Sequence, residues 1–380
     1  MIFFSSFKRT LRSSRALQLK DGDDMTTLYV TEPYSVIKKE GETLVVNVPA
    51  DERNNKPARK IEVPTIKVSE VVVLGDSTFT AQALAALLDQ KVEITFLNSF
   101  GNFRGRVIPS ESKNSLLRLN QFRVHEDARR SFELARQFVS GKLHNMKTLL
   151  LRSNRRLNDP VITSAVESLR GIQEQVEKLE PDSEPPAEPG KPQKGTAWGT
   201  LQGLEGAGSA EYFEGFGRLL RRDGGLKFET RNRRPPRDPV NALLSYGYSL
   251  LQHQCASALQ TANLDPYIGF LHSSQYSKPA LSLDLMEEFR SPVVDSVVIT
   301  MINNRIIKAD DFIAEMGAFR LKDGARRTFL EKYEERMNTE IAHPVFKYQA
   351  TYRRCIELQA RLVAKTVDGE LDAYIPFKVR

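Results

Sequence analysis

The spacing of hydrophobic and polar positions changes near Pro109 and divides this chain into two parts. Between residues 28 and 107, short apolar or alternating segments are separated by Gly, Pro and Asp, which is typical of β-strands joined by turns. Beyond Pro109, apolar residues recur at helical spacing almost to the C-terminus. The pattern predicts a two-domain α+β chain, in which a small β-rich domain at residues 25–108 precedes a larger helical domain at residues 109–380.

Two stretches stand apart from these domains. Residues 1–24 are basic and serine-rich, contain no acidic residue before Asp21, and lack the apolar run of a secretion signal. Their composition fits a mitochondrial transit peptide. Alternatively, these residues are translated from a start codon upstream of the true one. We favour Met25 as the true start, with a disordered extension before it. Residues 180–196 are rich in proline and predict an exposed loop inside the helical domain.

Composition narrows the class of protein. At 380 residues, 40% of them hydrophobic and 27% charged, the chain has enough apolar residues for a core in each of two domains. It contains no apolar run long enough to span a bilayer, so we expect a cytosolic protein without membrane contact. Cys255 and Cys355 lie far apart without the spacing of a zinc site, and we expect both to be reduced core residues.

Basic residues are concentrated in one loop. The formal net charge is +7, which favours polyanionic partners. Within residues 218–237 only Asp223 and Glu229 oppose the basic side chains, and arginine is well suited to phosphate groups. We predict that this loop contacts nucleic acid, with a mobile solvated loop as the alternative. Its basic residues are Arg218, Arg221, Arg222, Lys227, Arg231, Arg233, Arg234 and Arg237.

The chemically richest stretch lies at residues 266–292. It contains His272 and, on a predicted helix, Asp284 and Glu287. Because residues three apart share one helix face, the two carboxylates point the same way. An imidazole nitrogen beside carboxylate oxygens suits Mg²⁺ or Mn²⁺ better than it suits a thiolate-type zinc site. The alternative is an ordinary histidine near acidic residues.

Two further polar residues come earlier in the helical domain. Glu205 has glycines on both sides in a predicted helix, and such glycines let another backbone or a ligand approach closely. Glu205 is either the third acid of the metal site or an exposed residue on a tightly packed helix pair. Asn241 follows Asp238 and Pro239, which predict the cap and the first turn of another helix.

These motifs, in their order along the chain, resemble the CRISPR-associated adaptation integrases, also described as universal spacer-acquisition endonucleases. The resemblance runs from about Met25 to the C-terminus. Residues 1–24 and the proline-rich loop depart from the family pattern. The matching stretches are residues 203–206, 212–213, 239–245, 247–248, 269–272, 281–290, 352–354 and 359–361.

The resemblance implies a β-rich dimerisation domain followed by an all-α catalytic domain that binds Mg²⁺ or Mn²⁺. Carried over residue by residue, the metal ligands are Glu205, His272 and Glu287. Asp284 matches a neighbouring acid that either supports the ligands or binds the metal transiently, and Arg290 matches a basic position near the scissile phosphate. We also count Asn241 among the catalytic residues, because its helix is expected to bring DNA to the site.

The implied reaction inserts captured DNA into a CRISPR array, where the 3′-hydroxyl of a fragment attacks a phosphodiester at the edge of a repeat. The implied partners are double-stranded DNA and a second copy of the chain. A small ferredoxin-like CRISPR-associated protein is expected to complete a hetero-hexamer in the prokaryotic cytoplasm. Two alternatives use the same residues, namely a structure-selective nuclease acting on branched DNA and a non-catalytic DNA-binding scaffold.

Overall fold

The structure is a computed structural model, and its described residues fall into two compact units. The units are Met1–Glu111 and Ser112–Arg380, so the division comes a few residues after the predicted boundary. The described residues are 2–4, 26–51, 57–98, 101, 103–109, 114–182, 195–221, 225–232, 235–272, 278–315 and 317–380.

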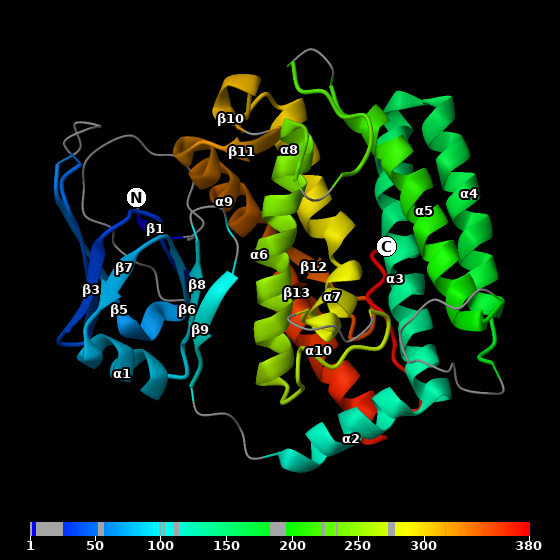
Figure 1. The fold of residues 1–380 in the computed structure, drawn as a ribbon, viewed down its shortest axis with the longest axis horizontal. Helices are drawn as coiled ribbons and strands as arrows, with labels where there is room; N and C mark the ends of the chain where they lie inside the picture. Colours follow the sequence, from blue (N-terminus) through cyan, green and yellow to red (C-terminus); the bar gives the residue numbers. More distant parts are fainter. Residues whose placement is uncertain are drawn as a thin grey trace. The chain divides into compact units, whose positions relative to one another are not determined.

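In its described part, the first unit contains two β-sheets and the helix α1 (Ala81–Asp89) (Figure 1). One sheet has the strand order β1 (Ile2–Phe4), β2 (Thr26–Val30), β6 (Val68–Leu74), β8 (Glu93–Leu97) and β9 (Phe103–Val107). The other has the order β5 (Arg59–Pro64), β4 (Thr43–Val48), β3 (Ser35–Glu40) and β7 (Ser77–Phe79). Strands β2, β6 and β8 run parallel, whereas β3, β4 and β5 pair antiparallel.

Apolar residues from both sheets form one core in this unit. Val71 and Val73 of β6 are buried in the same cluster as Ile37 of β3 and Val46 of β4, and α1 contributes Leu87. Residues two apart on a strand face the same side of a sheet, which is why the alternating pattern predicted these strands. The β-rich domain expected from the sequence is therefore present.

The N-terminal extension and the proline-rich loop are described only in part. Ile2–Phe4 pair antiparallel with β2, so these three residues differ from the expected disorder. The rest of the extension lies outside the described residues, as do residues 183–194 of the predicted loop.

The second unit is mostly helical, which confirms the predicted fold class. Two short hairpins, β10 (Phe312–Glu315) with β11 (Ala318–Leu321) and β12 (Glu340–Ala342) with β13 (Gln349–Thr351), correct the expectation of an all-α domain. None of the described helices is long and apolar enough to cross a membrane. The helices are α2 (Ser115–Glu126), α3 (Ala128–Leu157), α4 (Pro160–Lys178), α5 (Ala197–Leu219), α6 (Pro239–Thr261), α7 (Ala280–Glu287), α8 (Ser296–Asn303), α9 (Asp323–Met337) and α10 (Tyr352–Asp368).

Aspartate caps define several helix starts. Asp127 separates α2 from α3 and caps α3 by accepting hydrogen bonds from two backbone N–H groups. Asp159 caps α4 in the same way, with Pro160 in the first turn. Asp238 caps α6 ahead of Pro239, as predicted. Helices α3, α4 and α5 then pack side by side (Figure 1).

The C-terminal segment, residues 371–380, runs beside α3 without regular secondary structure (Figure 1). The ring of Phe377 stacks on Phe289, with ring centroids 4.5 Å apart. Asn145 of α3 donates a hydrogen bond of 2.7 Å to the Phe377 carbonyl, and the Phe377 N–H donates one of 2.7 Å to the Glu288 carboxyl group. The segment therefore ties α3 to the turn that follows α7.

Both cysteines belong to the core of the second unit. Cys255 in α6 and Cys355 in α10 are buried and free, as predicted. Burial raises the pKa of the Cys355 thiol to about 12, which keeps it uncharged and unreactive at neutral pH.

Candidate functional site

Glu205 is positioned by the close packing of α5 against α3. A Cβ added at Gly208 of α5 would lie 2.3 Å from Leu143 Cδ2, so glycine is what lets the two helices approach this closely. Glu205 lies three residues before Gly208 and therefore on the same helix face. Its carboxylate contacts Lys142 Nζ on α3 and accepts a hydrogen bond of 3.1 Å from Ser209 Oγ. The glycine-rich helix thus makes the close approach predicted from its sequence.

Glu287, at the C-terminal end of α7, contacts the same lysine. Lys142 Nζ lies 2.8 Å from Glu287 Oε2, and Arg290 donates a hydrogen bond of 2.7 Å to Glu287 Oε1. Glu287 is 4% exposed, so its charge is removed from bulk water. The Lys142 ammonium, 2.8 Å away, lies against its Oε2 atom. This buried carboxylate oxygen is therefore held by a cation that the chain itself supplies.

The neighbouring cations keep both carboxylates ionised. Burial is the largest effect on the pKa of Glu205 and would raise it, but the charge and hydrogen bond of Lys142, together with the charge of Arg290, lower this pKa. Burial would also raise the pKa of Glu287, but the charges of Arg290 and Lys142 hold it well below its usual range. Metal-binding carboxylates must be deprotonated, so both groups have the required charge at neutral pH.

Asp284 fixes the loop that carries His272. Its buried carboxylate accepts hydrogen bonds of 2.6 to 3.0 Å from the backbone N–H groups of Phe270, Leu271 and His272. The same carboxylate lies 2.7 Å from His272 Nδ1, so this nitrogen carries the proton and Nε2 is left as an acceptor. His272 Nε2 lies 4.0 Å from Glu287 Oε1. Asp284 therefore orients the imidazole toward Glu287.

A buried network holds Arg290. This residue begins a π-helical segment, Arg290–Asp295, and such segments are frequent at functional sites. The Arg290 guanidinium lies 4.2 Å from the centroid of the Tyr248 ring. Tyr248 and Tyr212 both donate hydroxyl hydrogen bonds to Asp295. These contacts fix the guanidinium from more than one helix.

Asn241 lies in a different cluster, at the start of α6. Its Oδ1 atom accepts hydrogen bonds of 2.6 Å from Arg231 and 3.0 Å from the Asn232 N–H, and its Nδ2 atom donates one of 2.8 Å to the Thr230 carbonyl. Arg231 also lies 5.4 Å from the centroid of the Tyr248 ring. The structure thus uses Asn241 and Arg231 to anchor the segment before α6.

The other predicted DNA contacts are described in part. Arg218, Arg221, Lys227 and Arg237 are exposed to solvent. Arg218 Nε lies 3.9 Å from Asp159, while its side chain remains 41% exposed. Arg222, Arg233 and Arg234 lie outside the described residues.

The residue types around Lys142 fit a divalent metal, although their spacing is not that of a complete ligand set. In the part of the chain that the structure describes, no three His, Cys, Asp or Glu side chains form a group that could hold a metal ion. The Lys142 ammonium contacts both Glu205 and Glu287 and stands in for a cation there. With His272, these carboxylates are donors that suit Mg²⁺ or Mn²⁺. Glu205, Glu287 and His272 are therefore candidate ligands.

Lys142 is the residue that sequence reasoning missed. It lies at helical spacing with Val139 and Met146, and both of these residues are buried. A lysine is rarely found on the buried stripe of a helix unless it is paired. Its position on this stripe was the signal that could have identified it.

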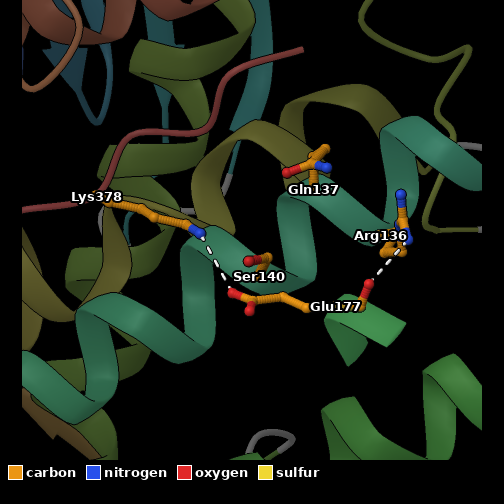
Figure 2. A pocket seen from close by; sticks show the side chains of 5 residues that line it. All are labelled: Arg136, Gln137, Ser140, Glu177 and Lys378. Carbon is orange, nitrogen blue, oxygen red and sulfur yellow. Dashed lines mark hydrogen bonds and ion pairs between the residues drawn. The ribbon is translucent and has the colours of Figure 1, made fainter. Parts of the chain in front are cut away.

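A separate pocket of the second unit contains none of the predicted site residues (Figure 2). Its charged groups are paired with one another. Lys378 Nζ lies 3.8 Å from the Glu177 carboxylate, and Arg136 donates a hydrogen bond of 3.2 Å to the Glu177 carbonyl. We assign it no functional role. Its lining residues are Arg136, Gln137, Ser140, Glu177 and Lys378.

Comparison with known sequences points to one family. The family model described as CRISPR associated protein Cas1 matches residues 28–335. A CRISPR-associated endonuclease Cas1 of Thermus thermophilus is 35% identical over 361 residues, which cover 94% of this chain and 99% of that protein. A CRISPR-associated exonuclease Cas4/endonuclease Cas1 fusion of Geobacter sulfurreducens is 36% identical over 357 residues, or 93% of this chain. The chain spans only 60% of that fusion's length.

Solved structures share the fold. A casposase bound to integration product has a TM-score of 0.76 and 22% identity, covering 93% of this chain and 94% of that chain. A chain of a Cas6-RT-Cas1–Cas2 complex has a TM-score of 0.71 and 24% identity, covering 96% of this chain and 38% of that chain. These similarities extend over both units of the present structure.

Proposed function

Because the chain belongs to the family of CRISPR associated protein Cas1, we propose that it is a metal-dependent DNA endonuclease and integrase of CRISPR adaptation. One observation carries the proposal. Glu205 and Glu287 meet on a single buried ammonium, and His272 Nε2 lies 4.0 Å from Glu287 Oε1. Separate segments of the chain thus bring together two acids and an imidazole.

In the proposed reaction, the 3′-hydroxyl of a captured DNA fragment attacks a phosphodiester at the edge of a CRISPR repeat. A new phosphodiester forms as the bond to the displaced strand breaks. Glu205, Glu287 and His272 would hold Mg²⁺ or Mn²⁺, which when bound supplies Lewis-acid stabilisation of the charge on the phosphoryl group.

The chain's own residues prepare the site for this chemistry. Asp284 keeps the His272 proton on Nδ1, so Nε2 remains an acceptor. Arg290 is 5% exposed and fixed by Glu287 and the Tyr248 ring. A fixed positive charge in a site shielded from water stabilises a phosphate more strongly than the same charge in solvent. Arg290 therefore has the role of binding the scissile phosphate.

The proposal extends to partners. We propose that the chain acts as a homodimer on double-stranded DNA, with a small ferredoxin-like CRISPR-associated protein that completes a hetero-hexamer. One structural neighbour is a casposase bound to integration product and another belongs to a complex that contains Cas2, which supports partners of these kinds. The exposed Arg221, Lys227 and Arg237 support contact with DNA phosphates.

The test is a strand-joining assay on a CRISPR repeat with Mn²⁺. We expect Glu205→Ala, His272→Ala and Glu287→Ala each to abolish joining while DNA binding stays nearly intact. Glu214→Ala is the matched control, because Glu214 is an exposed acid on the same helix as Glu205. Joining by His272→Ala at the wild-type rate would refute the metal assignment.

The products also separate the alternative functions. Both relatives are endonucleases, which supports a nuclease as the alternative function, with branched DNA as its expected substrate. Such an enzyme would yield cut strands without joined ones. A DNA-binding scaffold would show no metal-dependent turnover in either assay.

A further inference from the structure

Lys142 is a buried cation that the proposed reaction does not use. Its side chain is 1% exposed, and its Nζ atom contacts Glu205 Oε1 and lies 2.8 Å from Glu287 Oε2. Three helices meet at this atom, because α3 supplies the lysine, α5 supplies Glu205 and α7 supplies Glu287. An ammonium group is costly to bury unless it is paired, and these two carboxylates are its partners.

Lys142 also offsets the electrostatic repulsion between the two carboxylates. Two carboxylates that share one site repel each other, and one of them then tends to take up a proton. Lys142 places one positive charge between Glu205 and Glu287, and Arg290 places a second beside Glu287. Two negative charges are thus balanced by two positive charges from the chain itself. The charges of Glu205 and Glu287 are therefore neutralised without a metal.

A divalent cation would need the same oxygens. Glu287 Oε2 is buried, and the Lys142 ammonium lies against it at 2.8 Å. An ammonium and a divalent ion repel each other strongly at contact distance in a buried site, so both cannot hold these oxygens together.

We infer that Lys142 is a resident counter-cation that holds Glu205 and Glu287 in the metal-free protein and is displaced from them when the metal binds. The inference rests on the proposed function, in which these carboxylates are metal ligands. It follows that Lys142 stabilises the metal-free protein and weakens metal binding. Lys142 therefore sets the metal concentration at which the site fills.

The experiment compares three variants of the full chain with the wild type. Lys142→Met keeps the aliphatic stem and removes the charge, whereas Lys142→Arg keeps a charge. Lys147→Met is the matched control, because Lys147 lies on the same helix and donates a hydrogen bond of 2.6 Å to Gln173 instead of a carboxylate. Mn²⁺ binding is measured by electron paramagnetic resonance of the free ion, and thermal unfolding is measured in EDTA.

We expect Lys142→Met to bind Mn²⁺ at least about tenfold more tightly than the wild type. In EDTA it should unfold at a lower temperature, and Mn²⁺ should raise its melting temperature more than it raises that of the wild type. Lys142→Arg and Lys147→Met should keep an Mn²⁺ affinity close to the wild-type value. If Lys142→Met does not fold in EDTA, saturating Mn²⁺ should restore its fold.

Several outcomes would overturn the inference. If the wild type binds Mn²⁺ and Lys142→Met binds it equally or more weakly, the inference fails while the proposed function stands. Equal tightening in Lys142→Arg would show that shape matters and charge does not. A Lys142→Met chain that stays unfolded with saturating Mn²⁺ would also refute it. If neither the wild type nor any variant binds Mn²⁺, the metal assignment fails and the inference fails with it.

Discussion

The carboxylate of Asp284 is surrounded by hydrogen-bond donors. Three backbone N–H groups and His272 Nδ1 converge on it, and it has no exposed surface. Charge-assisted hydrogen bonds of this kind make a buried carboxylate tolerable and rigid. The orientation of the imidazole therefore depends on a residue that is not itself a candidate ligand.

Replacing this carboxylate by an amide tests its orienting role. In Asp284→Asn one oxygen becomes an NH₂ group that faces backbone donors, and we expect the free energy of unfolding to fall by about 3 kcal/mol. Strand joining should fall with it, because His272 loses its fixed tautomer. Asp265→Asn is the control, since Asp265 is less buried and its side chain accepts a hydrogen bond from the Tyr267 N–H. Urea unfolding measures both variants, and equal small losses would contradict the prediction.

His343 predicts a pH dependence of stability. It is fully buried, and burial lowers its pKa to about 4. In the unfolded chain a histidine titrates near pH 6.5, so below that pH the unfolded state binds a proton that the folded state does not. The stabilisation is complete above about pH 6.5 and is lost as the pH falls toward about 4.

We therefore expect the free energy of unfolding to fall by up to about 1.4 kcal/mol per pH unit across this window. His343→Asn should show a shallower fall, because asparagine does not titrate but keeps an acceptor for the Val345 and Phe346 N–H groups. Urea unfolding of both proteins at a series of pH values provides the measurement. Parallel curves would rule out His343 as the source.

At the residue scale, residue type and the order of motifs along the sequence were sufficient to select the candidate metal ligands. Glu205, His272 and Glu287 were selected in this way, and the structure brings them to one place. Lys142 was missed because a lysine on a long helix is normally solvated, and its place on the apolar stripe of α3 was not used as a signal. Arg231 was grouped with the DNA contacts because its loop is basic, yet the structure engages its guanidinium with Asn241.

At the scale of elements, the contact between α3 and α5 decides whether Glu205 reaches the site. Gly208 allows that contact, since a Cβ there would lie 2.3 Å from Leu143 Cδ2. We expect Gly208→Ala to lower the free energy of unfolding by about 1–3 kcal/mol through overpacking. Strand joining should also fall as Glu205 moves away from Glu287.

Gly203→Ala is the matched control for this prediction. Gly203 lies on the same helix, is exposed, and would have no atom within 4 Å of an added Cβ. Alanine should therefore raise the free energy of unfolding there by up to about 1 kcal/mol through helix propensity. Thermal or urea unfolding compares the two variants, and a shift of the same sign in both would refute the packing explanation.

Element types were largely predictable, whereas their boundaries depended on local chemistry. Strands β2 to β6 and β8 followed from apolar or alternating segments, because each buries one or both faces in a shared core. Strand β1 lies in the extension that was expected to be disordered, and β7 and β9 were not predicted. The break at Asp127 was not predicted, since the helical spacing of apolar residues continues across it. The hairpins β10–β11 and β12–β13 were also not predicted, because strands of three or four residues are too short to show a period.

At the scale of the whole molecule, the net charge is +7, and the basic residues have either structural or binding roles. Arg231 and Arg290 are engaged within the second unit, whereas Lys227 and Arg237 are exposed. Exposed basic residues that bind phosphates release counterions, so DNA affinity falls with salt. Outside the candidate active site, burial thus separates the basic residues expected to bind DNA from those expected to stabilise the fold. Buried Arg290 is the exception, because it is proposed to bind the scissile phosphate.

A salt titration tests this division. We expect the double variant Lys227→Gln/Arg237→Gln to reduce the salt slope of DNA binding by up to about 0.9 per lost phosphate contact. Arg231→Gln should instead lower the free energy of unfolding and leave the slope nearly unchanged. Fluorescence anisotropy of labelled DNA at several salt concentrations measures the slopes. A slope reduced only by Arg231→Gln would reverse the assignment.

The lysine between the two carboxylates has a consequence for how the cell controls this protein. Zinc fingers are unfolded without their metal, so metal supply determines how much folded protein exists. In the inferred role of Lys142 the chain carries its own compensating charge, so we expect it to fold without an ion. Together with the proposed metal dependence, this predicts that starvation for divalent ions leaves folded but inactive protein. We expect activity to return when the ions return, without new protein synthesis.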